Sequence, residues 1–356
     1  MSETNTAAIL PAVGKDLELT TLPVPTPGPN DVLIRTAVTA VNPIDHVRQM
    51  FGFQVPAVPK VIGSDTTGTV VGVGAEAAST YKVGDRVVAV TDGFATGDNG
   101  HESYQTFAVA PTLTTAKLPD NFTFLEGSTV SVVAMTAGII IFEGFKFSIP
   151  GAQEQSKPLP SNKPILLVWG GAGSVGSVTI QLARILGFTV FTTASPRHNE
   201  RLQKLGAEVV VDYSDADAAV EKLLAAAGDR PIVYAVDAIN DAKNTIPFVE
   251  SILLKSAAAT ASSTTPELVH VKMLSEYKWK DGLTHTFINS TSIWTERRDV
   301  GEYIFRSGNL TSWLAEGKIV PPPARVVPGG LGGLQSALNQ IKGGGVSGEK
   351  LVVEVA

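Results

Sequence analysis

The chain has 356 residues, of which 44% are hydrophobic and 17% charged, and its formal net charge is −6. This length and composition can bury a large core in about two domains, which excludes an intrinsically disordered segment. Lys and Arg form no basic block, so the sequence lacks the electrostatic pattern of nucleic-acid binding. There is no cysteine, which excludes disulfides, thiolate catalysis and every cysteine-based zinc site.

Signals for export and for membrane insertion are not visible in the sequence. Residues 1–6 lack the basic and apolar segments of a secretory signal. The longest uncharged stretch, residues 127–142, contains Ser, Thr and Gly and is shorter than the roughly 20 residues that span a bilayer. We therefore expect a cytoplasmic protein without membrane contact, in which residues 127–142 form a buried helix.

Short β-type runs, broken by Pro and Gly, fill the chain up to about residue 119. The clearest runs are residues 31–38, 68–74 and 83–90. This punctuation is typical of a mostly β, barrel-like unit. The tail from residue 321 returns to the same character and closes with a β-type run at 347–355.

From about residue 127, apolar runs alternate with helical patterns. The pattern predicts strands at 165–169, 189–193, 209–211 and 232–236, and helices at 176–186, 201–205 and 216–227. Strand–helix alternation of this kind predicts a doubly wound parallel sheet. Residues 262–300 are polar with scattered aromatic residues, and no element is predicted there.

A glycine-rich turn follows the apolar run 165–169. Its sequence matches G-x-G-x-x-G between a predicted strand and a predicted helix, the context in which this pattern indicates dinucleotide binding. The first glycine is expected to permit the tight turn, the second the approach of a pyrophosphate, and the third close packing of the helix. Free N–H groups at the start of the helix would then bind the phosphates. The alternative is a glycine-rich turn without a ligand. The predicted cofactor-binding residues of the turn are Gly171, Ala172, Gly173, Ser174, Val175 and Gly176.

The end of the second predicted strand indicates which dinucleotide binds. NAD sites usually place Asp or Glu there, but residues 193–199 contain no acid. Ser195 can donate a hydrogen bond and Arg197 can pair with a 2′-phosphate, which favours NADPH as the cofactor. The alternative for Arg197 is a solvated residue at a helix start. Tyr213, after the third strand, is a candidate for the adenosine pocket or an ordinary, partly buried tyrosine.

Together these segments resemble the medium-chain dehydrogenase/reductase superfamily over essentially the whole chain. The resemblance rests on the order of VNPID at 41–45, IGSD at 62–65, VGDRV at 83–87, TAG at 136–138, the glycine turn, and SGEK at 347–350. It implies an α/β fold with two domains. Residues 1–126 and 301–356 would form a GroES-like β-barrel domain, and residues 127–300 a Rossmann domain that binds NADPH in a doubly wound parallel sheet.

Zinc alcohol dehydrogenases of this superfamily carry Cys near position 42 and Gly-His-Glu near position 63. This chain has Asn-Pro-Ile-Asp at 42–45 and Gly-Ser-Asp at 63–65, so we expect no metal. His46, His101 and Glu102 are accordingly expected to be surface polar residues. The Asn-Pro-x-Asp segment is similar to quinone reductases and enoyl reductases. Residues 169–171, 63–65 and 347–350 look most like the trans-acting enoyl reductases of fungal polyketide pathways.

The resemblance implies hydride transfer from NADPH to an activated C=C bond of an enoyl thioester or another α,β-unsaturated carbonyl. A quinone reductase with the same cofactor site is the close alternative. A third hypothesis is an NADPH-binding cyclase, isomerase or binding module without net redox turnover. Enoyl reductases of the mitochondrial type have a tyrosine soon after the Asn-Pro motif, but residues 48–54 contain none. The proton donor is then water or a residue of another loop, and Phe51 and Phe53 either shape a substrate pocket or are core or loop-anchoring aromatics.

The candidate catalytic residues are Asn42, on the nicotinamide side, and Thr136, near the nicotinamide ribose or the phosphates. Lys350 is a candidate cofactor ligand. The alternatives are a turn residue before a proline for Asn42 and an exposed lysine for Lys350. Asp45 and Asp65 are expected to cap or brace local structure.

The expected partner is a small-molecule or carrier-bound unsaturated substrate, the latter with a transient synthase partner. A monomer is favoured over a homodimer, because residues 262–300 are long enough to cover a sheet edge.

Overall fold

The computed structural model describes residues 4–152, 157–159, 161–274 and 276–355, and its contacts divide the chain into two compact units. Unit 1 comprises Met1–Met135, Trp294–Gly317 and Pro321–Ala356, and unit 2 comprises Thr136–Ile293 and Lys318–Val320. The domain limits that the sequence suggests, at 126/127 and 300/301, remain a prediction.

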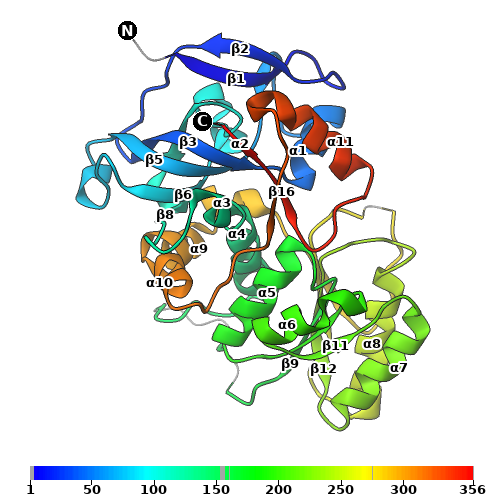
Figure 1. Cartoon of the computed structure of the whole chain (residues 1–356). Coiled ribbons are helices and arrows are strands. Elements are labelled where there is room, and N and C mark those ends of the chain that lie inside the picture. Colours follow the sequence, from blue (N-terminus) through cyan, green and yellow to red (C-terminus); the bar gives the residue numbers. More distant parts are fainter. Residues whose placement is uncertain (1–3, 153–156, 160, 275, 356) are drawn as a thin grey trace. The chain divides into compact units, whose positions relative to one another are not determined.

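Unit 1 is built on two sheets (Figure 1). The larger sheet has seven strands in the order β15-β16-β3-β5-β6-β8, with β7 paired to β3, and the smaller has the order β2-β1-β4. All pairs are antiparallel except β15 with β16. The strands are β1 (Asn5–Leu10), β2 (Glu18–Leu22), β3 (Asp31–Ala40), β4 (Lys60–Val61), β5 (Asp65–Val73), β6 (Arg86–Val90), β7 (Phe107–Pro111), β8 (Thr115–Lys117), β15 (Ala324–Val326) and β16 (Lys350–Glu354).

The core of unit 1 lies between these strands and the helices beside them. Val32 and Ile34 of β3 pack with Val70 of β5 and Val87 of β6, all fully buried. Arg35 is the exposed residue of β3, whereas the polar Thr36 and Thr39 of the same strand are buried. The α-helices of this unit are α1 (Pro43–Phe51), α2 (Gly93–Thr96), α3 (Phe124–Gly127), α9 (Arg298–Gly301), α10 (Asn309–Ala315) and α11 (Leu334–Lys342).

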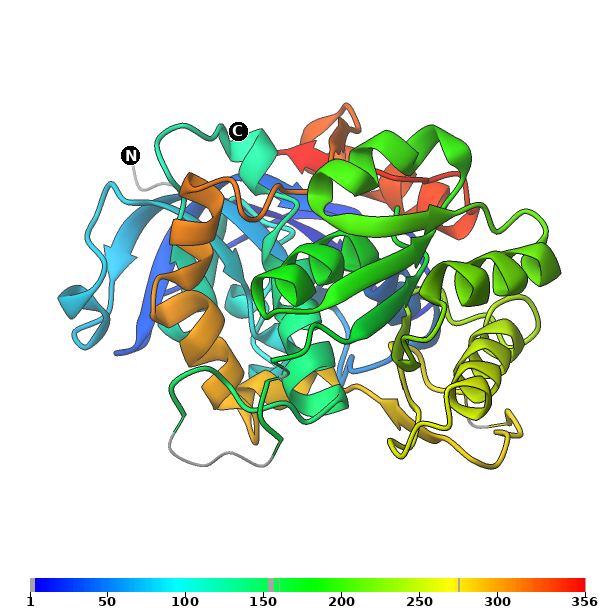
Figure 2. The ribbon, with the colours of Figure 1, turned by 90° about the horizontal axis from the view of Figure 1, so that it is seen from below.

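Unit 2 contains a six-stranded parallel sheet in the order β11-β10-β9-β12-β13-β14. Helices α5, α7 and α8 contact its strands, and Figures 1 and 2 show them in green to yellow. The strands are β9 (Ile165–Trp169), β10 (Thr189–Thr193), β11 (Ala207–Val211), β12 (Ile232–Asp237), β13 (Glu267–His270) and β14 (Thr284–Phe287), and the helices are α5 (Ser174–Ile185), α6 (Asn199–Leu205), α7 (Ala216–Ala227) and α8 (Ile246–Ala259). The predicted doubly wound sheet is therefore confirmed.

The apolar stretch around residues 127–142 is helical, as predicted. Helix α4 (Ser131–Ile139) continues into a π-helical turn, Ile140–Gly144, and the boundary between the units falls inside α4. The stretch Phe124–Gly144 is long and apolar enough to cross a membrane, but 78% of its most apolar window is buried inside the protein. Such burial is what a core helix shows.

Candidate functional site

The glycine turn joins β9 to α5 at the carboxyl end of the parallel sheet in unit 2. Gly170, not Gly171, has the left-handed backbone (φ +84°) that makes the turn, which corrects our assignment of the tight turn to Gly171. A Cβ on Gly171 would lie 2.0 Å from Thr192 Oγ1, and one on Gly176 2.4 Å from the Gly170 carbonyl oxygen. Gly171 and Gly176 are therefore required for close packing, as predicted for Gly176.

The N-terminus of α5 presents backbone N–H groups that have no hydrogen-bond partner among the described residues. The N–H of Gly171 bonds the Thr193 carbonyl at 3.0 Å and that of Gly173 the Gly170 carbonyl at 3.2 Å. Within the described part of the chain, no partner occurs for the N–H groups of Ala172 and of 174–176, the first three residues of α5. Free N–H groups and the positive end of the helix dipole suit a phosphate.

Cationic and polar side chains lie beside this turn. Ser195 Oγ and the Tyr213 hydroxyl are 3.3 Å apart, so the ends of β10 and β11 bring these two predicted residues together. Arg197 is exposed and its Nε donates to His198 at 3.2 Å. Arg201 Nη2 donates to the Ala172 carbonyl oxygen at 2.9 Å, so Arg201 is a candidate site residue that the sequence analysis missed. Its only sequence signal was its place one helical turn after Arg197.

In unit 1, a carboxylate links most of the other candidates. Asp65 is fully buried at the start of β5. Its Oδ2 accepts from Asn42 Nδ2 at 2.9 Å and from Lys350 Nζ at 2.6 Å. Its Oδ1 accepts from the Ser131 hydroxyl at 2.5 Å and from the Val132 N–H at 2.8 Å. The end of β3 and the starts of β5 and β16 thus bring Asn42, Asp65 and Lys350 together.

Lys350 is 4% exposed, so the alternative of an exposed lysine is wrong. Its ammonium forms an ion pair with Asp65, and its role toward the cofactor stays a prediction. The expectation that Asp65 braces local structure is confirmed, because four donors from three chain segments meet on its carboxylate.

Asp45 holds the start of α1 directly after Asn42. Its Oδ2 accepts from the Asn42 N–H and from the Tyr104 hydroxyl, both at 2.8 Å, so Asp45 caps the helix as expected. Its Oδ1 is buried without a hydrogen-bond partner. Burial raises the pKa of Asp45 to about 6, although the Asn42 N–H, the charge of Arg48 and the Tyr104 hydroxyl oppose the shift.

The expected surface position of His101 and Glu102 is wrong. Glu102 is fully buried and accepts from both Nη atoms of Arg48, at 2.7 and 2.5 Å. The Lys60 ammonium lies 3.6 Å from the same carboxylate. The His101 side chain is 15% exposed and lies 2.5 Å from an oxygen of Asp92. Bidentate pairing with Arg compensates the desolvation that otherwise keeps Glu at the surface.

For the remaining candidates, Thr136, Phe51 and Phe53, the structure gives the degree of exposure. Thr136 is buried in α4. Phe51 is 75% exposed and Phe53 is 47% exposed, so neither is a core aromatic. No three His, Asp or Glu residues of the described chain are grouped as metal ligands would be.

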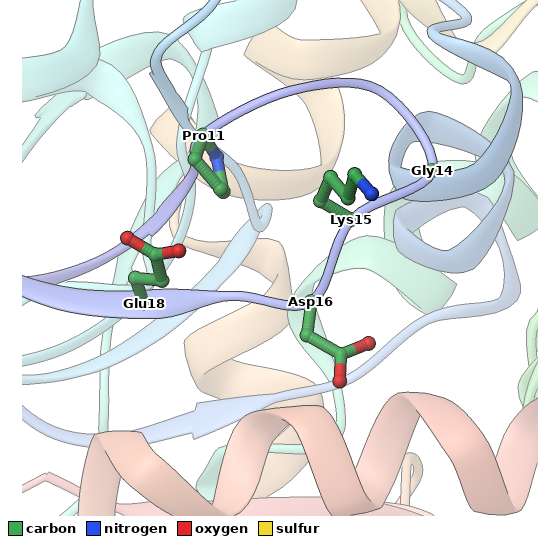
Figure 3. Close-up of a pocket in the computed structure, with 5 residues that line it drawn as sticks. All are labelled: Pro11, Gly14, Lys15, Asp16 and Glu18. Atoms are coloured by element: carbon green, nitrogen blue, oxygen red, sulfur yellow. The ribbon is translucent and has the colours of Figure 1, made fainter.

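A surface hollow lies at the turn between β1 and β2, away from all of these residues in the sequence. Figure 3 shows its lining side chains, Pro11, Gly14, Lys15, Asp16 and Glu18. Two carboxylates against one ammonium give this hollow no preference for a phosphate.

Comparison with known proteins identifies the family of the chain. The family described as alcohol dehydrogenase GroES-like domain matches residues 28–120, and the family described as zinc-binding dehydrogenase matches residues 174–252. The trans-enoyl reductase tndF of Aspergillus flavipes is 32% identical over 356 residues, which cover 99% of each chain.

Two solved structures share the fold over nearly the whole chain. The CurK enoyl reductase has a TM-score of 0.75 at 19% identity, covering 99% of both chains. A mycobacterial protein solved in complex with NADPH has a TM-score of 0.72 at 23% identity, covering 98% of this chain and 99% of the other.

The fold, the glycine turn and the similarity to a trans-enoyl reductase define an oxidoreductase. The chain belongs to the zinc-free branch of the medium-chain dehydrogenase/reductase superfamily.

Proposed function

We propose that this chain is an NADPH-dependent reductase that transfers a hydride to an activated C=C bond. The substrate class is an enoyl thioester or another α,β-unsaturated carbonyl, in cytoplasmic secondary metabolism of the polyketide type. The observation that carries the proposal is the 32% identity to a trans-enoyl reductase over 99% of both chains. Identity at this level along the whole length includes both units and not the nucleotide-binding unit alone.

The residues of unit 2 support NADPH as the cofactor. The free N–H groups at the start of α5 suit the pyrophosphate. The end of β10 offers Ser195 and Arg197 in place of the acid that binds a ribose 2′-OH, and Arg201 adds a second guanidinium beside the glycine turn. Arg pairs with a phosphate through fixed, bidentate geometry. Tyr213, hydrogen-bonded to Ser195, would flank the adenosine.

We assign the candidate residues of unit 1 and α4 to the nicotinamide end of the cofactor, where the hydride is transferred. When bound, the cofactor supplies the hydride. Asn42 would line the nicotinamide, and its amide is held in one orientation because Nδ2 donates to Asp65. Thr136 would face the nicotinamide ribose or the phosphates. Lys350 would support the cofactor site from its ion pair with Asp65. Residues 48–54 offer no tyrosine, so water or a residue of another loop protonates the product.

The substrate is free or carrier-bound, and a carrier-bound chain requires a transient synthase partner. We propose a monomer as the working form. The quinone reductase and the NADPH-binding cyclase or isomerase are the competing outcomes of the test below.

The test combines binding and product analysis. NADPH and NADH are titrated into the purified protein, and a panel of 2-enoyl thioesters and quinones is then offered with NADPH. We expect tighter binding of NADPH and a saturated thioester in amounts equal to the NADPH consumed. Quinol formation without C=C reduction would assign the chain to the quinone reductases. NADPH binding without consumption by any substrate would refute a reductase.

A further inference from the structure

Three cationic or titratable side chains follow the end of β10, and one of them contacts the glycine turn. Arg197 and His198 belong to the short 3-10 turn Pro196–His198, and Arg201 is the third residue of α6. Arg197 Nε donates to His198 Nε2 at 3.2 Å, and Arg201 holds the Ala172 carbonyl of the glycine turn at 2.9 Å. In the described structure neither guanidinium is in an ion pair with a carboxylate.

The acids around this cluster are engaged elsewhere. Glu200 of α6 is 83% exposed and bonds Lys204 at 2.7 Å. Asp212, after β11, accepts from the N–H and the hydroxyl of Ser214. Residues 170–176 of the glycine turn carry no charge. The nearest polar pair on the β10 and β11 ends, Ser195 with Tyr213, is neutral.

The environment of His198 therefore disfavours its protonated form. Burial lowers the pKa of His198 below its ordinary value of 6.5, and the charges of Arg201 and then Arg197 lower it further. The hydrogen bond agrees with this state. Because Arg197 Nε can only donate, His198 Nε2 must accept, and the proton of the neutral ring lies on Nδ1.

We propose that His198 is a proton-linked ligand of the 2′-phosphate of NADPH, acting with Arg197 and Arg201. This inference rests on the proposed function, which assigns NADPH to this site. A phosphate dianion between the three groups reverses the local field, so the imidazolium becomes the favoured form. On protonation, Nε2 loses its lone pair and releases the Arg197 contact, and its N–H then becomes a donor to the anion. Binding takes up one proton, which links cofactor choice to pH.

The pH dependence of binding follows from the pKa of His198 in the free protein and in the phosphate-bound protein. The free ring titrates below 6.5, and the phosphate-bound ring titrates above its free value because the dianion stabilises its charge. Between the two values, each rise of one pH unit weakens binding of a 2′-phosphorylated ligand by up to tenfold. NADH lacks the 2′-phosphate, so its affinity stays constant over the same range. NADPH preference therefore shrinks as the pH rises.

The experiment is calorimetric titration of the full chain at pH 7.5 in buffers of different ionisation enthalpy. The probes are NADPH and 2′,5′-ADP, with NADH and 5′-AMP as ligands without the 2′-phosphate. A phosphate monoester has a second pKa of about 6, so at pH 7.5 the ligand is mostly a dianion and any proton taken up enters the protein. We expect proton uptake with the two 2′-phosphorylated ligands only, and a loss of affinity between pH 6.5 and 8.5.

Two variants separate His198 from other sources of protons. His198→Asn keeps a polar side chain that cannot titrate, and it should abolish both the proton uptake and the pH slope. His285→Asn removes an exposed histidine of β14, at the opposite edge of the same sheet, and it should behave as the wild type. Thermal melts confirm that both variants fold.

The outcomes distinguish this inference from the proposed function. If NADPH binds more tightly than NADH but His198→Asn keeps the proton uptake, the role of His198 is overturned and the NADPH assignment stands. If neither NADPH nor 2′,5′-ADP binds, both the inference and the cofactor assignment fall.

Discussion

Replacing Asp65 by Asn tests the buried network at its centre. The substitution keeps the shape of the side chain but removes the charge that faces the Lys350 ammonium at 2.6 Å. Lys350 is 4% exposed and Asp65 fully buried, so water cannot replace the lost partner. The new Nδ2 group of Asn would also face at least one of the donors that now converge on the carboxylate, from Asn42 and Ser131.

The magnitude follows from the ammonium that the substitution leaves buried and unpaired. Breaking a buried ion pair by removing one partner costs about 3–5 kcal/mol. The expected loss in the free energy of unfolding of unit 1 is therefore about 3–5 kcal/mol.

Hydrogen exchange with peptide resolution in increasing urea measures the two units separately. We expect peptides of unit 1 to lose protection in Asp65→Asn while those of unit 2 keep it. The double variant Asp65→Asn/Lys350→Met should recover part of the loss, because no unpaired charge remains. A loss below about 1 kcal/mol, or a double variant less stable than the sum of the single variants, would refute the reasoning from the buried charge.

Three further perturbations test the glycine turn, the cofactor preference and a buried pair. Gly176→Ala places a Cβ 2.4 Å from the Gly170 carbonyl oxygen, so α5 must shift, and fluorescence titration should show NADPH affinity at least tenfold weaker in a folded protein. Arg197→Ala should reduce the preference for NADPH over NADH by roughly tenfold to a hundredfold, the range of a charge-assisted contact; an unchanged ratio would place the 2′-phosphate elsewhere. Burial opposes the charge of His101, but the hydrogen bond and charge of Asp92 outweigh it and raise the pKa of His101. Its stabilisation is therefore complete below 6.5 and is lost as the pH rises through the raised value, so melting temperatures of His101→Asn should lack this alkaline decline.

The parallel sheet could be predicted because its signal is local. The strand at 165–169 is a continuous apolar run and that at 189–193 is β-branched and aromatic, and all ten residues are buried as a sheet covered on both faces requires. Residues 262–300 gave no prediction, yet they contain β13 and β14. Strand β14 is a short edge strand with mostly exposed side chains, THTF. Such a strand owes its form to pairing with β13 and not to its own pattern.

The residues of the candidate site also divide into those that a local sequence pattern predicts and those that it does not. The glycine turn lies between a strand and a helix that are adjacent in sequence, and its motif was therefore readable. Asp65 and Lys350 are 285 positions apart, and Arg48 and Glu102 are 54 apart. No local pattern reports that such residues meet, and charged residues alone predict a surface position. This is why Glu102 was misplaced, and why the partner of Lys350 could not be foreseen.

The most direct test of the account follows the hydride itself. The protein is incubated with a 2-enoyl N-acetylcysteamine thioester and NADPH carrying deuterium at both C4 positions, and the product is analysed by mass spectrometry and NMR. The account predicts a saturated thioester with one deuterium on the β-carbon, and much slower turnover with NADH. A product without deuterium, or NADPH that binds and is never consumed, would contradict the assignment as a reductase of activated C=C bonds.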